Sequence, residues 1–191
     1  MISRSFFDEH PSEFFDFYCN RMVFTDAEPN QAHRKLAELE CEGTIRAVIT
    51  QNIDGLHQAA GSKAVRELHG SVLRNYCMNC GMSYSADEVL TLHALDDDGI
   101  PRCPACAGIV KPDVVLYEEP LDERVLRASI EAIAQAGMLV VAGTSLAVYP
   151  AAGLIDYFRG SHLVIINRSP TPRDRQADLC IAANVGDVFD F

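Results

Sequence analysis

Met138-Leu139-Val140-Val141-Ala142 is a continuous apolar run of five residues. A run of this length and composition is typical of a strand that is buried on both faces of a parallel sheet. The residues before it predict a helix that Asp122 caps and Gly137 ends. Three apolar side chains would share one face of that helix: Leu126, Ile130 and Ile133. Together the two elements predict one helix-strand repeat.

The same order of elements recurs on both sides of this repeat. Toward the C-terminus, a helix is predicted over residues 151–159 and an apolar strand over residues 162–166. Toward the N-terminus, Asn30 can cap a helix that ends near Gly43, and the β-branched residues 45–50 predict a buried strand. Alternating helices and apolar strands predict an α/β fold in which helices cover both faces of a doubly wound parallel sheet.

Two CxxC pairs interrupt this pattern. They are Cys77-Met78-Asn79-Cys80 and Cys103-Pro104-Ala105-Cys106, with twenty-two residues between them. Two such pairs complete a tetrahedral shell of four thiolates around one Zn²⁺. The alternatives are two disulfides or a redox motif, but the first residues lack the apolar run of a secretory leader, and a redox motif needs no matching second pair. We predict one structural zinc ion outside the chemistry, because four sulfurs leave no open position.

The zinc segment predicts a small module inserted into a larger domain. Residues 72–110 contain their own turn signals and a helical stretch over Ala86–Leu95, so we assign them to the zinc module. Residues 1–71 and 111–191 are then predicted to form the large domain, with the aromatic-rich residues 1–28 as a helical segment packed on it.

Charge and hydropathy exclude several classes of partner. The chain carries 16 Lys and Arg against 27 Asp and Glu, a net charge of -11, which opposes binding to nucleic acid. No stretch approaches the ~18 consecutive apolar residues of a transmembrane helix. We expect a cytoplasmic protein without nucleic-acid or membrane partners.

Polar residues follow three of the predicted strands, where open parallel sheets bind their ligands. Gln51-Asn52-Ile53-Asp54 follows the first, Gly143-Thr144-Ser145 the second and Asn167 the third. Each segment alone is equally typical of a turn, but their joint placement predicts a binding site. Among the six histidines, His69 is the best candidate for acid-base chemistry, because it lies in a loop beside a strand and imidazole titrates near neutral pH.

In this order, these segments resemble the sirtuin family of NAD-dependent protein lysine deacylases. The likeness runs through nearly the whole chain, and the ordered set is specific although each motif alone is weak. Besides the double CxxC, it rests on Thr50-Gln51-Asn52-Ile53-Asp54-Gly55-Leu56-His57, Glu67-Leu68-His69-Gly70, Lys111-Pro112-Asp113-Val114-Val115, Gly143-Thr144-Ser145-Leu146, Tyr149-Pro150-Ala151-Ala152 and Asn167.

The resemblance implies a Rossmann-like large domain that binds NAD, a small zinc module, and an acyl-lysine protein or peptide held in the cleft between them. It implies an enzyme that removes the acyl group and yields nicotinamide and O-acyl-ADP-ribose. By the same likeness, His69 is the catalytic base, and Asn52 and Asp54 act with it at the nicotinamide and its ribose.

The resemblance also implies the residues that hold the two substrates. Contacts with NAD are implied for Gln51, Asn52, Ile53, Asp54, His69, Gly143, Thr144, Ser145, Asn167 and Val185. The stretch from Val110 to Glu118 resembles the segment that pairs with the peptide backbone as an added strand. Substrate contacts are implied for Val110, Lys111, Pro112, Asp113 and Val114.

Two departures from the family pattern affect these expectations. None of the twelve glycines is spaced as GxG, and the chain opens at a point that would fall after the family's glycine-rich NAD loop. We therefore expect weak or absent NAD-dependent activity, and a sheet that lacks a central strand and has two unpaired edges. Tyr117-Glu118-Glu119 also stands where many members have Phe-Gly-Glu. Two other functions stay open: a non-catalytic binder of NAD or ADP-ribose, and a zinc-ribbon interaction module.

Overall fold

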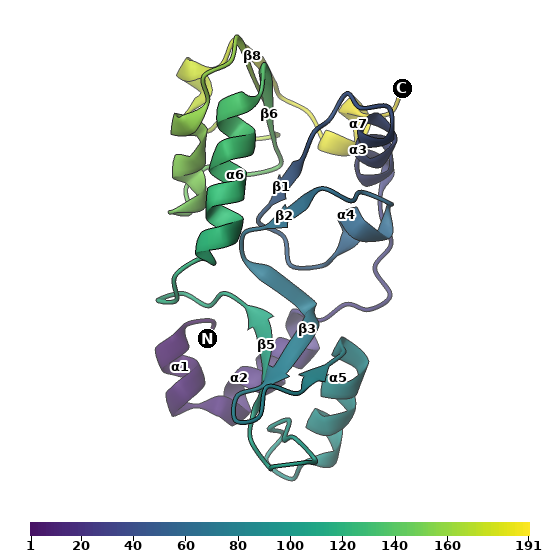
Figure 1. Ribbon diagram of the computed structural model, residues 1–191, viewed down its shortest axis with the longest axis vertical. Coiled ribbons are helices and arrows are strands. Elements are labelled where there is room, and N and C mark those ends of the chain that lie inside the picture. The colour runs from purple at the N-terminus through teal and green to yellow at the C-terminus, as the bar shows by residue number, and fades with distance from the viewer. The chain divides into compact units, whose positions relative to one another are not determined.

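The computed structural model describes residues 1–191, which form two compact units (Figure 1). Unit 1 comprises Met1–Ala27, Asn52–Gly55 and His69–Leu121. Unit 2 comprises Glu28–Gln51, Leu56–Leu68 and Asp122–Phe191. Because the segments of the two units alternate along the sequence, each unit is assembled from residues far apart in the chain.

Unit 2 contains the parallel strands that the sequence predicted. Asn30 and Asp122 cap its two longest helices through side-chain bonds to backbone N–H groups, as predicted. The predicted strand over residues 45–50 is shorter, and the predicted helix over residues 151–159 is a 3-10 helix. The elements are α3 (Gln31–Cys41), β1 (Val48–Thr50), α4 (Leu56–Ala59), β2 (Val65–Glu67), α6 (Glu123–Gln135), β6 (Met138–Ala142), η1 (Ala151–Tyr157), β7 (His162–Ile166), η2 (Asp174–Gln176), β8 (Leu179–Ile181) and α7 (Val185–Val188).

The parallel strands of unit 2 form two separate sheets. β1 pairs with β2, while β6, β7 and β8 follow one another in a second sheet. Every pairing is parallel, with Val48 opposite Val65 in the first sheet and Met138 opposite His162 in the second. No strand pairs with the other edge of β1 or of β6. The structure therefore confirms the α/β fold with parallel strands, but it divides these strands between two sheets where the sequence predicted one.

One face of β6 is exposed, which corrects the prediction that both faces of this strand are buried. Leu139 and Val141 pack against a cluster that includes Ile155 of η1. Met138 and Val140 alternate with them along the strand and are 55% and 41% exposed. The apolar run is compatible with burial on both faces of the strand, but other parts of the chain cover only one face.

Unit 1 is built on a small antiparallel sheet. β3 lies in the centre, with β4 on one side and β5 on the other, and its pairing with β5 is irregular between Ser71 and Asn75. The predicted helix over Ala86–Leu95 is present at those residues, and Ser85 caps it with a capping box. The elements are α1 (Arg4–Glu9), α2 (Pro11–Arg21), β3 (Gly70–Cys77), β4 (Ser83–Tyr84), α5 (Ala86–Leu95) and β5 (Val110–Val114).

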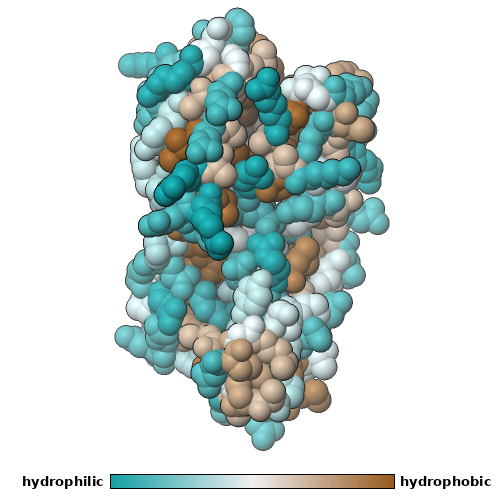
Figure 2. Space-filling model, viewed as in Figure 1, coloured by the Kyte–Doolittle hydropathy of each residue, from teal (hydrophilic) through white to brown (hydrophobic).

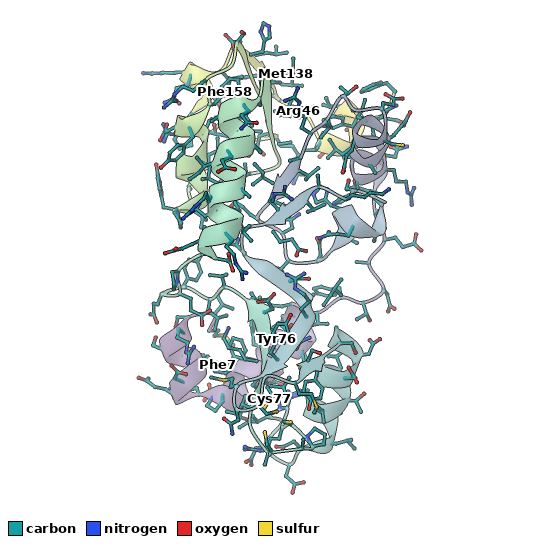
Figure 3. All side chains as sticks on the ribbon, viewed as in Figure 1. Phe7, Arg46, Tyr76, Cys77, Met138 and Phe158 are labelled. Atoms are coloured by element: carbon teal, nitrogen blue, oxygen red, sulfur yellow. The ribbon has the colours of Figure 1, made fainter.

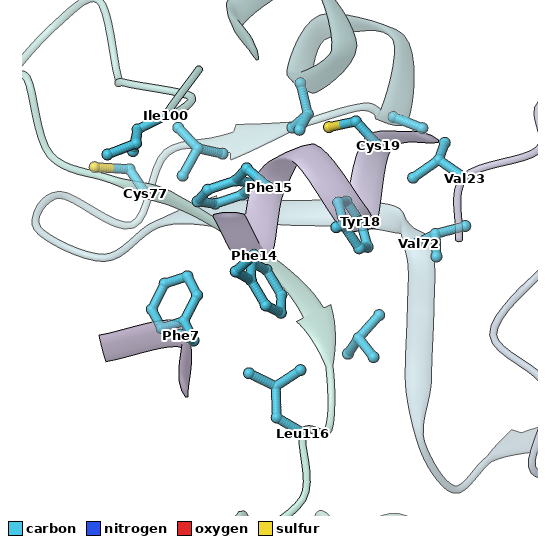
Figure 4. Packing of buried hydrophobic residues seen from close by; sticks show 14 of the residues in the cluster. Phe7, Phe14, Phe15, Tyr18, Cys19, Val23, Val72, Cys77, Ile100 and Leu116 are labelled. Carbon is cyan, nitrogen blue, oxygen red and sulfur yellow. The ribbon is translucent and has the colours of Figure 1, made fainter. Parts of the chain in front are cut away.

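The core of unit 1 is an aromatic cluster contributed by α1 and α2 (Figure 4). The rings of Phe7 and Phe14 meet edge to face at 5.0 Å, and Phe14 stacks on Tyr18 at 5.9 Å. The cluster continues into Val89 of α5 and Val110 of β5. The predicted division, with residues 1–28 on the large domain, thus differs from the structure, in which residues 1–27 share a core with the zinc segment.

The surface in Figure 2 is hydrophilic over most of the face that it shows, and hydrophobic atoms gather at the end that carries α5. The exposed apolar residues of the zinc segment, residues 72–110, include Met78, Met82 and Leu95. None of the helices has both the length and the apolar character that crossing a bilayer requires.

Candidate metal centre and nucleotide site

The four predicted zinc ligands lie together at one end of unit 1. The Sγ atoms of Cys77 and Cys106 are 3.4 Å apart, those of Cys80 and Cys103 are 3.7 Å apart, and all four lie within 4.8 Å of one another. Zn–S bonds of about 2.3 Å in a tetrahedron place the sulfurs about 3.8 Å apart. These separations exceed the ~2.05 Å of a disulfide bond. The cluster is positioned to bind one zinc ion.

Two tight turns bring the four sulfurs together. In the first, Cys77 N–H donates to the carbonyl of Met82 at 2.8 Å, and Gly81 has a positive φ of 74°. In the second, Cys103 N–H donates to the carbonyl of Gly108 at 2.8 Å. The first turn follows β3, where Cys77 lies beside Tyr76 (Figure 3). Both ligand pairs are therefore held in turns that backbone bonds close just beyond the second cysteine of each CxxC segment.

The four ligands differ in exposure and in hydrogen bonding. Cys77 and Cys103 are buried in the core of unit 1, whereas Cys80 and Cys106 are exposed. The Tyr84 hydroxyl donates to Cys103 Sγ at 3.0 Å and, as the largest contribution, lowers the pKa of that thiol to about 6. Backbone N–H groups, that of Cys80 foremost, lower the pKa of Cys77. These donors favour the thiolate form that binds zinc.

The polar residues at the carboxyl ends of the parallel strands come together within unit 2. Gln51 Nε2 donates to Thr144 Oγ1 at 3.4 Å, which joins the ends of β1 and β6. Gly143 N–H donates to the carbonyl of Ile166 at 2.9 Å. A Cβ atom on Gly143 would lie 3.5 Å from Val185 Cγ2. Thus Gln51, Gly143, Thr144 and Val185, predicted from separate segments, are neighbours.

The remaining unit 2 candidates lie in the loops that follow β6 and β7. Asn167 directly follows β7, and its side-chain amide donates to the carbonyl of Ser169 at 2.8 Å. Ser145 is exposed. Leu146, which follows it, has a positive φ of 51°, and its N–H donates to Thr144 Oγ1 at 3.2 Å. This tight turn leaves the Ser145 hydroxyl open to a ligand.

The other candidates, Asn52, Ile53, Asp54 and His69, belong to unit 1. The carbonyl of Ile53 accepts from Val72 N–H at 2.9 Å, so the loop lies against the start of β3. His69 immediately precedes β3, and its carbonyl accepts from Val115 N–H at 3.0 Å. A Cβ atom on Gly70 would lie 1.8 Å from the carbonyl oxygen of Asp113, so only glycine fits after His69.

The segment expected to pair with a peptide includes β5 and the loop after it. β5 pairs with β3 along one edge only. Beyond β5, Tyr117 pairs with the N-terminal residues: Arg4 N–H donates to its carbonyl at 2.9 Å, and its N–H donates to the carbonyl of Ile2 at 3.0 Å. This contact gave no signal in the sequence, because neither partner lies in a patterned strand.

The loop after Tyr117 is fixed by two carboxylates. Glu118 has a positive φ of 78°, and its carboxylate accepts from the N–H and the hydroxyl of Ser5 at 2.9 and 3.1 Å. Glu119 accepts from Leu116 N–H at 2.9 Å and pairs with Lys111 and Arg4. The glutamate that replaces the glycine of the family pattern is therefore held in a glycine-like conformation by Ser5.

We expect Glu119→Gln to lower the free energy of unfolding by about 2 kcal/mol at pH 7, the size of lost hydrogen bonds to a charged group. Burial alone would raise the pKa of Glu119, but Leu116 N–H, Lys111 and Arg4 together hold it below the ordinary value of 4.5. A depressed pKa gives stability that is present above pH ~4.5 and is lost as the pH falls through the folded-state value.

Urea unfolding of Glu119→Gln and of Glu9→Gln between pH 3 and pH 7 tests this expectation. Glu9 is an exposed glutamate of the same unit. The difference between wild type and Glu119→Gln should be largest at pH 7 and should shrink as the pH falls, while Glu9→Gln follows the wild type. Equal stability of all three proteins at pH 7 would show that the carboxylate does not hold this loop.

Comparisons with known proteins agree with this geometry. The model of the Sir2 family matches residues 1–150. An NAD-dependent protein deacetylase of Clostridium acetobutylicum is 53% identical over 190 residues, covering 100% of this chain and 76% of that protein. One of Clostridium perfringens is 54% identical over 190 residues, covering 99% and 76%. A solved structure of a Sir2 protein with a p53 peptide and NAD⁺ superposes with a TM-score of 0.93 at 40% identity, covering 99% of this chain and 79% of that one.

Proposed function

The chain belongs to the Sir2 family, and from that membership we propose that it is an NAD-dependent protein-lysine deacetylase or deacylase. Its substrates are acyl-lysine side chains of proteins or peptides, and its products are the free lysine, nicotinamide and O-acyl-ADP-ribose. The observation that carries the proposal is the contact of Gln51 with Thr144, which joins the polar residues that follow β1 and β6 in the two parallel sheets. Open α/β sheets bind nucleotides at the carboxyl ends of such strands. We propose the cytoplasm as its compartment.

The unit 2 residues fit part of a dinucleotide. Gly143 has no side chain and a positive φ of 63°, so its backbone can approach a ligand closely. The exposed Ser145 hydroxyl and the Asn167 amide offer hydrogen bonds to ribose and phosphate oxygens. These residues, with Val185 beside Gly143, would bind the nucleotide and take no part in bond making or breaking.

The unit 1 residues carry the chemistry. Bound NAD supplies a ribosyl carbon that accepts the acyl oxygen as nicotinamide leaves. The Asp54 carboxylate would stabilise the positive charge that develops on this sugar, and the amide of Asn52 would orient the nicotinamide group or a water. His69 would then take a proton from a ribose hydroxyl, which lets that oxygen attack the former amide carbon. The bond from this carbon to the lysine nitrogen then breaks, the lysine leaves as the free amine, and one water supplies the oxygen that completes O-acyl-ADP-ribose.

The peptide would bind along the segment from Val110 to Glu118. Main-chain bonds to an added strand give affinity with little sequence selectivity, and alternate side chains face opposite sides of the strand. Val110, Pro112 and Val114 face the core, so Lys111 and Asp113 are the β5 side chains on the other face. The excess of acidic residues favours a basic peptide. Zinc would hold unit 1 together and take no part in the reaction.

We expect NAD to bind the polypeptide of residues 1–191 about 100-fold more weakly than the Clostridium acetobutylicum relative. The glycines of this polypeptide include no GxG loop to donate N–H groups to the diphosphate. Two lost bonds to charged oxygens are worth about 3 kcal/mol, which corresponds to ~100-fold in affinity. Isothermal titration calorimetry of both proteins measures the ratio, and equal affinities would contradict the expectation.

A non-catalytic binder of NAD or ADP-ribose is the second candidate, since residues 1–191 contain no GxG spacing. Incubation with NAD and an acetyl-lysine peptide distinguishes the two functions. Deacetylation that requires NAD supports the enzyme, whereas saturable NAD or ADP-ribose binding without any release of nicotinamide supports the binder.

A further inference from the structure

The hydroxyl of Tyr84 contacts the cluster of four cysteines. Its Oη atom lies 3.0 Å from Cys103 Sγ and 3.2 Å from Met82 Sδ. A hydroxyl has one proton, so it can donate to only one of these sulfurs. A thioether is a weak acceptor, whereas an ionised thiolate accepts about twice as strongly as a neutral group. The proton is therefore directed to Cys103 when this cysteine ligates zinc.

Cys103 depends on such a donor more than the exposed ligands do. Its side chain is 1% exposed, so water cannot solvate its charge, whereas Cys80 and Cys106 are exposed to solvent. Cys77 is also buried, but its donors are backbone N–H groups of its own CxxC turn. Cys103 has backbone donors of the same kind and, in addition, the hydroxyl of Tyr84. A buried charge that loses a donor is costly.

The sheet and the following helix hold Tyr84 in place. Tyr84 is opposite Asn75 in the pairing of β4 with β3, and the Asn75 side chain donates to the Tyr84 carbonyl at 3.3 Å. Ser85, the next residue, caps α5 and bonds Glu88. The ring packs on the core of unit 1. Because the sheet and the helix cap fix the backbone on both sides of Tyr84, its hydroxyl is held toward Cys103 Sγ.

From this geometry we propose that Tyr84 is a positioning residue of the zinc site. Its hydroxyl stabilises and orients the buried Cys103 thiolate and thereby strengthens zinc binding. Hydrogen-bond partners behind metal ligands are worth about 10- to 100-fold in metal affinity. Tyr84→Phe keeps the packed ring and removes only the O–H group. It is expected to weaken zinc binding about tenfold, at the lower end of that range.

The zinc dissociation constant of the holo-protein, measured by competition with a chromogenic chelator, tests the proposal. Tyr84→Phe should bind zinc about tenfold more weakly than the wild type. Tyr76→Phe is the matched control, since it removes the hydroxyl of a tyrosine that precedes Cys77 in β3. Met82→Leu removes the other sulfur beside Tyr84. Both controls should bind zinc as the wild type does.

A spectroscopic measurement tests the hydrogen bond itself. In cobalt-substituted protein, the sulfur-to-cobalt charge-transfer band should shift to lower energy in Tyr84→Phe, because the thiolate loses a donor, and should not move in Tyr76→Phe. The band comes from metal-bound molecules alone, so it reports on the bond even where the substitution lowers stability. Unchanged zinc affinity together with an unmoved band in Tyr84→Phe would overturn the proposal, and so would an equal effect of Tyr76→Phe.

Discussion

Loss of zinc is expected to unfold unit 1 while unit 2 keeps its structure. Cys77 and Cys103 belong to the same buried cluster as Phe14 and Phe15, so the metal site and the core of this unit are continuous. Structural zinc contributes about 10 kcal/mol or more of binding free energy, which is as large as the whole stability of a typical domain. Without the metal, the proximity of the four sulfurs, which lie within 4.8 Å of one another, contributes no comparable free energy to folding.

Cys103→Ser and chelation of the wild type should therefore have the same effect. We expect the thermal transition of unit 1 to disappear in both, as followed by circular dichroism and by fluorescence of the tyrosines. Cys41→Ser is the matched control, since Cys41 is exposed and belongs to unit 2. A Cys103→Ser protein that melts as the wild type does would mean that the aromatic cluster folds without the metal.

His69→Ala is expected to lower the rate of NAD-dependent deacetylation about 10²- to 10⁴-fold, the range for loss of a general base. His69 immediately precedes β3, and its backbone bond to Val115 does not involve the side chain, so the fold should survive the substitution. The rate should fall at every pH between 6 and 9, because no other group replaces the imidazole.

Initial rates of nicotinamide release with an acetyl-lysine peptide measure this effect. His162→Ala is the control, since His162 is an exposed histidine at the start of β7. A zinc content and a melting temperature equal to those of the wild type show that His69→Ala is folded. Full activity of folded His69→Ala would remove His69 from the mechanism, whereas equal loss in both variants would point to a nonspecific effect.

The metal ligands and the longer helices were predictable because their signals are local. The spacing within Cys77–Cys80 and Cys103–Cys106 fixes which sulfurs can share an ion. Asn30 and Asp122 cap helices through bonds to N–H groups only a few residues away. Polar residues after β1 and β6 meet through the bond of Gln51 to Thr144, although the two strands belong to different sheets, which the sequence did not predict.

The parts that the sequence did not predict depend on contacts between distant segments. The aromatic residues of α2 predicted a helix but not the surface on which this helix packs, which is the zinc segment. The three-residue strand β8 is too short for a periodic signal, and its pairing with β7 defines it. The hydrogen bond of Tyr84 to Cys103 and the bonds of Ser5 to Glu118 join residues with no shared motif.

The most direct test of the proposed reaction is the fate of the acetyl group. The holo-protein is incubated with NAD and a peptide acetylated on one lysine, and the products are identified by mass spectrometry. The proposed reaction yields deacetylated peptide, nicotinamide and O-acetyl-ADP-ribose in equal amounts, all absent when NAD is omitted. Deacetylated peptide and free acetate formed without NAD, or NAD bound and returned intact, would contradict it.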